Sequence, residues 1–151
     1  MITKMYKVLL VEDETIHGLT ERTTHLEFVE DFALIVVETA SEAEKTIREQ
    51  GNEFDAIIID VRLNPGHDPK WIEVFSRPEE RLGIYLVNDI AIDFPHLLNR
   101  MGVTTIERWK DIQPLFAENA KIDPSVQYYS KVDSNEPKEY EQFIRQIIHR
   151  D

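Results

Sequence analysis

Short apolar runs alternate with segments of helical periodicity along this chain. Residues 7–13 and 54–60 each contain an apolar run, Val8–Val11 and Ala56–Ile59, that ends in acidic residues. Ala33–Val37 is rich in β-branched residues, so we predict three buried strands. Residues 14–28 carry apolar positions at helical spacing, and residues 41–51 carry a second such pattern. The order strand, helix, strand, helix, strand is typical of a parallel α/β sheet.

The second predicted helix also carries signals at its ends. Ser41 and Glu44 have the spacing of a capping box, in which the two side chains bind amide groups of the first turn. Gly51 and Asn52 are expected to end that helix. In the first predicted helix, the positions at helical spacing are Ile16, Leu19, Thr23 and Leu26.

The C-terminal segment is equally regular. Residues 126–131 have the pattern of a strand, and Pro137 suits the first turn of a final helix. That helix is expected to pack on the core through a stripe formed by Tyr140, Phe143, Ile144, Ile147 and Ile148.

The middle of the chain is less regular. Residues 65–82 hold Pro65, Pro69 and Pro78 and are predicted to form an insertion. Trp71 and Phe75 are expected on one face of a short helix that pins this insertion to the core.

Beyond the insertion, we predict two helices with one strand between them. The helices are expected from Gly83 to about Ile92 and from Ile106 to Asn119. The strand is either Leu97-Leu98 or Gly102–Ile106, and the pattern leaves both open.

Acidic residues stand where two of the predicted strands end. Glu12 and Asp13 follow the first strand, and Asp60 ends the third. Parallel strands finish at the same edge of a sheet, where open α/β folds place their ligands, so we expect three carboxylates in one pocket. Such like charges need a cation between them. A hard divalent ion, with Mg2+ as the best match, suits these oxygen ligands.

Composition narrows the classes of function. The chain has 151 residues, which suits a single domain spanning 1–151 with its own core. The net charge of −12 argues against direct binding to nucleic acid or to anionic membranes, because both need basic surfaces. The chain has no cysteine, no apolar segment of membrane-spanning length and no signal-peptide pattern, so we expect a cytoplasmic protein. Motifs for nucleotide binding or for a nucleophile elbow are also missing from the sequence.

With this order of strands and acidic strand ends, the chain resembles the receiver domain of two-component response regulators. The matching segments are Val8–Glu14, Ile57–Leu63 and Tyr128–Lys131, and Gly83 is similar to the glycine that opens the third helix of the family. The resemblance implies a flavodoxin-like α/β fold with a doubly wound five-stranded parallel sheet. Its strand order would be 2-1-3-4-5, with helices on both faces.

The resemblance also implies roles for single residues. Asp60 is then the phosphoacceptor, a carboxylate nucleophile, and Lys131 is the cation that contacts the phosphoryl group. Glu12, Asp13 and Asp60, together with the backbone carbonyl of Arg62, would hold the Mg2+ ion. Phosphoryl transfer depends mostly on positioning and charge neutralisation, which these groups supply.

Two further roles depend on the last two strands. Thr104, or Thr105 beside it, is the candidate for the hydroxyl that contacts the phosphoryl group, and Tyr128 stands at the place of the switch aromatic. The sequence also departs from the family pattern. Pro65 falls one residue later than usual, and Val132 replaces the proline that normally follows the lysine.

The function implied is a stand-alone receiver in a Mg2+-dependent phosphorelay. Its partners would be a histidine kinase or phosphotransfer protein and a downstream protein target, with a homodimer left open. Its signalling surface would lie in roughly residues 106–150. A receiver catalyses its own phosphorylation and dephosphorylation but is not a conventional enzyme.

Two alternatives belong to other classes. A degenerate receiver would keep the fold and the acidic pocket but act as a phosphorylation-independent protein-binding module. A metal-dependent phosphatase would use Asp60 as its nucleophile, but the second aspartate such enzymes carry two positions later is Arg62 here.

Overall fold

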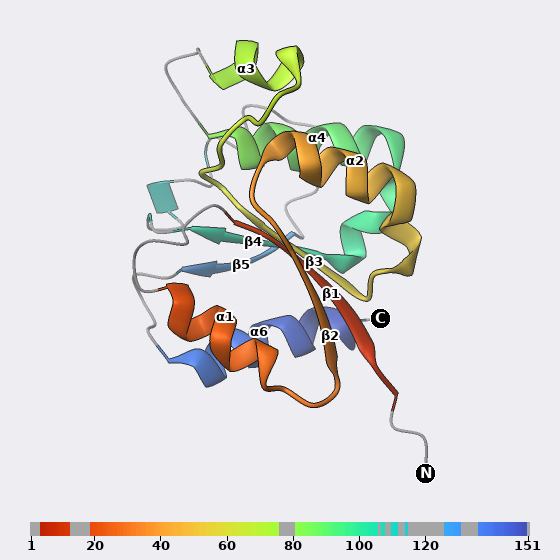
Figure 1. Ribbon diagram of the computed structural model, residues 1–151, viewed down its shortest axis with the longest axis vertical. Helices are drawn as coiled ribbons and strands as arrows, with labels where there is room; N and C mark the ends of the chain where they lie inside the picture. The colour runs from red at the N-terminus through yellow and green to blue at the C-terminus, as the bar shows by residue number, and fades with distance from the viewer. Residues whose placement is uncertain are drawn as a thin grey trace.

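A five-stranded parallel sheet is the centre of the fold. The structure, a computed structural model, describes residues 4–12, 19–75, 81–105, 107, 110–111, 114, 126–130 and 136–150, with the backbone alone for 19–22. The strands are β1 (Tyr6–Val11), β2 (Phe32–Val37), β3 (Ala56–Asp60), β4 (Met101–Thr105) and β5 (Gln127–Ser130). They follow the order β2-β1-β3-β4-β5, and every neighbouring pair is parallel (Figure 1). The predicted fold class and strand order are therefore confirmed.

Helices cover both faces of this sheet. They are α1 (Leu19–Glu27), α2 (Ala40–Gln50), α3 (Pro69–Phe75), α4 (Leu82–Asp93) and α6 (Pro137–Ile148), with short 3₁₀ helices at Gly51–Glu53 and Pro95–Arg100. Figure 1 shows α1 and α6 on one face and α2 and α4 on the other. Among the described helices, none combines the length and the apolar character needed to cross a bilayer.

The central strands are apolar on both sides because each of their faces packs on a helical layer. Val8 and Leu10 of β1 belong to the cluster shared with α1 and α6, whereas Leu9 and Val11 belong to the cluster shared with α2 and α4. All four side chains are almost fully buried. A strand buried on both faces has an unbroken apolar sequence instead of an alternating one, which explains why Val8–Val11 indicate a strand in the sequence.

The start of α2 differs from the prediction. The hydroxyl of Thr39, not of Ser41, accepts the amide of Glu42 at 3.1 Å and caps the helix. The Ser41 hydroxyl instead donates to the carbonyl of Pro65, and Glu44 turns toward α3. The capping-box prediction was therefore wrong, because tertiary partners take both side chains. The predicted stop at Gly51 is confirmed as the C-cap.

The remaining elements decide the position of the fourth strand and confirm the last helix. β4 occupies Met101–Thr105, so the second of the two strand candidates is correct, and Leu97 is buried in a 3₁₀ helix instead. Pro137 begins α6 as predicted, and that helix buries Tyr140, Phe143, Ile144 and Ile147. The helix predicted for residues 106–119 lies mostly outside the described residues.

The described part of the insertion contains α3, which packs on α2 and α4. Trp71 of α3 is fully buried in the core cluster on that side, whereas Phe75 is 37% exposed. Trp71 therefore fixes the insertion as predicted, and Phe75 contributes less than expected. At the entry to the insertion, Asn64 forms a parallel bridge with Thr39, and its carbonyl accepts the amide of Ala40 at 2.9 Å.

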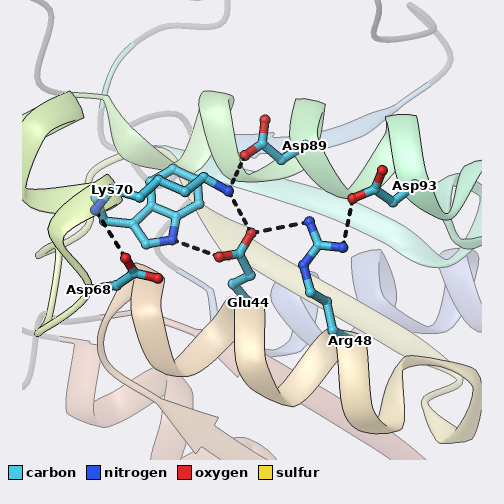
Figure 2. A network of polar contacts seen from close by, with 7 residues as sticks. Glu44, Arg48, Asp68, Lys70, Asp89 and Asp93 are labelled. Atoms are coloured by element: carbon cyan, nitrogen blue, oxygen red, sulfur yellow. Dashed lines mark hydrogen bonds and ion pairs between the residues drawn. The ribbon is translucent and has the colours of Figure 1, made fainter.

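A polar network around Glu44 completes this packing (Figure 2). The Glu44 carboxylate, on a side chain only 12% exposed, accepts the indole N–H of Trp71 at 3.2 Å and the ammonium of Lys70 at 2.9 Å. Lys70 also pairs with Asp89 at 2.7 Å, and Arg48 joins Glu44 to α4. Burial raises the pKa of Glu44, but these hydrogen bonds outweigh it and hold the pKa below its usual value.

Candidate functional site

Asp60 lies at the carboxyl edge of the sheet, as the last residue of β3. Asp60 is 1% exposed, and it stands in register with Thr104 of the neighbouring strand β4. The amide of Arg62 approaches its Oδ1 at 3.4 Å. A buried carboxylate is costly unless polar groups or a cation surround it, so this position is suited to chemistry.

β3 lies between β4 and β1 in the sheet, and Glu12 stands beside Asp60 on the side of β1. It follows Val11, which pairs with Ile59, so the sheet register places Glu12 next to Asp60 on adjacent strands, about 4.8 Å apart in backbone spacing. Glu12 is 6% exposed, and its Oε1 accepts the hydroxyl of Thr23 of α1 at 3.0 Å. The two predicted carboxylates that the structure describes are therefore brought together.

Gly83 brings α4 against the backbone of Asp60. The Gly83 amide donates to the carbonyl of Val61 at 2.9 Å. A Cβ atom at this position would lie 2.0 Å from the carbonyl oxygen of Asp60, so any larger residue would push the helix away from the strand end. The glycine noted in the sequence thus has a packing function directly behind the candidate nucleophile.

Two arginines and one glutamate form a second polar cluster near this edge. Arg81, which precedes α4, donates to the carboxylate of Glu107 from two nitrogens at 3.0 and 2.7 Å. Arg62, two residues after Asp60, reaches the same carboxylate at 3.2 Å. The hydrogen bond from Arg81 is the main reason that the pKa of Glu107 is lowered. This cluster ties together the segments that follow β3 and β4.

The candidate hydroxyl and aromatic residues lie on β4 and β5. Thr104 and Thr105 are both 1% exposed, and the hydroxyl of Thr105 accepts the amide of Glu107 at 2.9 Å. Thr104 is thus in register with Asp60, and Thr105 lies one residue further along the strand. Tyr128 pairs with Val103 and is 44% exposed, so its ring lies largely on the surface.

Two of the predicted site residues lie outside the described residues. Asp13 directly follows Glu12, and Lys131 directly follows Ser130, the last residue of β5. Within the described residues, no group of three or more His, Cys, Asp or Glu side chains is arranged to hold a metal ion. The proposed set of three carboxylates includes Asp13, so its geometry stays a prediction.

Sequence reasoning missed Thr23, Arg81 and Glu107. Thr23 is one of the positions at helical spacing in the first predicted helix, and a polar residue among apolar ones was the available signal for a side-chain hydrogen bond. Arg81 and Glu107 are 26 positions apart. No local pattern connects them, and only the fold shows that they meet.

Comparisons with known proteins identify the fold. No family model matches this chain, and no curated protein matches its sequence. A LuxR-family two-component response regulator from Aurantimonas superposes with a TM-score of 0.65 at 20% identity, covering 96% of this chain and 86% of that one. The BeF3-activated receiver domain of Klebsiella pneumoniae RstA gives 0.63 at 18% identity, covering 95% and 99%.

A third similar structure is the Mn2+-bound form of the response regulator Rcp1. Its TM-score is 0.59 at 20% identity, covering 93% of this chain and 91% of that one. At these identities the similarity concerns the backbone. The chain therefore has the fold of response regulator receiver domains, with the carboxyl edge of β1, β3 and β4 as its candidate site.

Proposed function

We propose that this chain is a cytoplasmic receiver that accepts a phosphoryl group on Asp60 in a phosphorelay. One observation carries the proposal. Asp60 ends the third strand of a receiver fold, buried between Glu12, which directly follows β1, and Thr104 of β4. The carboxyl edge of a parallel sheet is where such folds place their ligands.

The described part of the site suits a divalent cation. Glu12 and Asp60 offer buried carboxylate oxygens on adjacent strands, and two such charges repel each other unless a cation lies near them. Oxygen ligands favour Mg2+, and we propose Glu12, Asp13 and Asp60 with the Arg62 carbonyl as its ligands. The ion would neutralise charge on the phosphoryl oxygens. The Mn2+-bound structure of Rcp1 is consistent with this class of ion.

The other steps of phosphoryl transfer are assigned to side chains of this protein. An Asp60 oxygen attacks the phosphorus of a phosphohistidine, and the donor N–P bond breaks as the acyl phosphate forms. Lys131 would pair with the phosphoryl oxygens, and the hydroxyl of Thr104 or Thr105 would donate a hydrogen bond to one of them. These roles need positioning more than acid-base chemistry.

The output of the phosphorylated protein would be a protein contact. A histidine kinase or a phosphotransfer protein would donate the phosphoryl group, and a downstream protein would bind the altered surface. The added charge at Asp60 would bias a two-state surface within residues 106–150. In this account the protein is a phosphoacceptor and turns over no separate substrate.

Intact-mass measurement tests this proposal. The protein is incubated with acetyl phosphate, with Mg2+ or with a chelator, beside the matched variant Asp60→Asn. We expect a gain of one phosphoryl group in the wild type with Mg2+, and none with chelator or in the variant.

The negative results are equally specific. The protein could bind Mg2+ and yet be phosphorylated neither by acetyl phosphate nor by a protein that carries phosphohistidine. That result would favour the degenerate binding module. Phosphorylation of Asp60→Asn to the wild-type level would show that another residue is the acceptor.

A further inference from the structure

The edge strand β2 holds no charged residue, no proline and no bulge, three features that commonly protect an edge from pairing. Its six residues Phe32–Val37 are all apolar and include no proline. Within the described residues, β2 pairs with β1 alone, so its other side ends the sheet (Figure 1). Edge strands are usually guarded by charges, prolines or bulges, because their unpaired backbone groups can bind another strand.

The hydrogen bonds of the β1–β2 ladder show which backbone groups face this open side. The amide of Glu12 donates to the carbonyl of Val37 at 3.0 Å. In a parallel ladder every second residue of a strand bonds to a given neighbour, so the odd-numbered residues of β2 face β1. The amide and carbonyl groups of Leu34 and Val36 therefore point to the open edge, where an added strand could use them.

Apolar side chains near this edge are also open to contact. Val36 is 41% exposed, and Phe28, in the turn that leads into β2, is 81% exposed. Ala33 is exposed as well. An added strand would bury part of this surface while it pairs with the backbone, which is how sheet edges recognise extended peptides.

Charges at both ends of β2 indicate what kind of strand fits. Glu30 precedes the strand and Glu38 follows it, and both are exposed. Asp31 does not add to this charge, because Arg145 pairs with it at 2.8 Å. The two glutamates are eight positions apart, which corresponds to about 26 Å of extended chain. The edge is thus an apolar strip with an acidic group at each end.

This charge pattern argues against a second copy of the chain as the occupant. Antiparallel pairing of two β2 strands would place Glu38 of one copy near Glu30 of the other, and like charges opposite each other destabilise a strand pair. Each copy also carries a net charge of −12. We infer that β2 is a docking edge for an extended segment of a partner protein, with alternating apolar residues and a lysine or arginine at each end.

An NMR titration of the full chain tests this inference. The probe is a synthetic peptide of about ten residues, with a core of alternating valine and threonine and lysines at both ends. We expect the largest amide shifts at Leu34 and Val36, because their N–H groups face the added strand. The same peptide with glutamates in place of the lysines should bind at least about tenfold more weakly.

A matched pair of variants distinguishes backbone pairing from nonspecific hydrophobic binding of the peptide. Val36→Pro removes one outward N–H group, and proline is tolerated at such an edge position because the ladder to β1 is untouched. Val36→Thr keeps that N–H group. We expect Val36→Pro to weaken binding about tenfold and Val36→Thr to leave it nearly unchanged. Thermal unfolding of both variants confirms that the fold is kept.

Four results would overturn the inference. The lysine-ended peptide could fail to bind the wild type, or it could bind Val36→Pro as tightly as Val36→Thr. The glutamate-ended peptide could bind equally well, which would remove the charge argument. A concentration-dependent dimer that Val36→Pro abolishes would show that a second copy occupies the edge. None of these outcomes depends on phosphorylation of Asp60.

Discussion

The site edge and the insertion are held in place by different kinds of interaction. Glu12, Asp60 and Thr104 are aligned by the register of three neighbouring strands, each with a buried apolar interior. The α3 helix is held by one buried indole and by ion pairs that meet at Glu44. The site therefore depends on the whole sheet, whereas the insertion depends on a few side chains.

This difference predicts that the two regions respond separately to substitution. Loss of α3 docking should leave the strand ends, and with them the site, in place. Damage at the strand ends should affect both the site and the stability of the fold. The following substitutions test this separation, from the largest expected effect to the smallest.

Trp71→Ala should have the largest effect, and it should be local. Removing a fully buried indole costs about 4 kcal/mol in packing and leaves a cavity in the core cluster that α3 shares with α2 and α4. Hydrogen exchange should show the amides of α3 losing protection while those of β1 and β3 keep theirs. Phe75→Ala, on the same helix but at a 37% exposed position, is the control and should change little. Loss of protection in β3 would contradict the separation.

Gly83→Ala should destabilise the whole fold. The new Cβ atom would meet the carbonyl oxygen of Asp60 at 2.0 Å, and backbone cannot move aside without shifting the strand. We expect a loss of about 3 kcal/mol in the free energy of unfolding, measured by denaturant titration. Gly51→Ala is the matched control. Its Cβ atom would meet the flexible end of Leu97 at 2.8 Å and a methyl group of Ile47 at 3.4 Å, but no backbone atom among these nearest neighbours, so it should cost much less.

The features that the sequence predicts are those with a local pattern, and the features that it does not predict depend on contacts between distant residues. The strands and the position of Asp60 were predictable because unbroken apolar runs and their acidic ends are local patterns. The capping of α2 was not, because Thr39 and Ser41 are both good caps, and the loop at Pro65 decides between them by engaging the Ser41 hydroxyl. The Glu44 network joins residues 26 positions apart, so no local signal could reveal it.

Thr23→Val should weaken divalent metal binding by about tenfold, if the proposed site holds. The Thr23 hydroxyl orients the Glu12 carboxylate at 3.0 Å, and valine keeps the shape but removes that donor. Mg2+ titration followed by calorimetry measures the change, and Thr23→Ser should restore most of the affinity. Equal affinity in Thr23→Val would show that this hydrogen bond does not position Glu12 for the ion.

Acid should loosen α3 through Glu44. Because the pKa of this carboxyl is lowered in the fold, its contribution to docking is complete above its ordinary value of 4.5 and is lost as the pH falls through the lower folded value. The protection of α3 amides should therefore decrease below about pH 4.5. In Glu44→Gln this pH dependence should flatten. An unchanged profile in that variant would assign the acid sensitivity to other carboxylates.

The central claim is that Asp60 carries the phosphoryl group, and the most direct measurement locates that group. Protein treated with acetyl phosphate and Mg2+ is reduced with borohydride, which converts an aspartyl phosphate to homoserine, and is then sequenced by tandem mass spectrometry. The account predicts homoserine at position 60, and at no other acidic position. Homoserine at a different position, or none in protein that has gained phosphoryl mass, would contradict it.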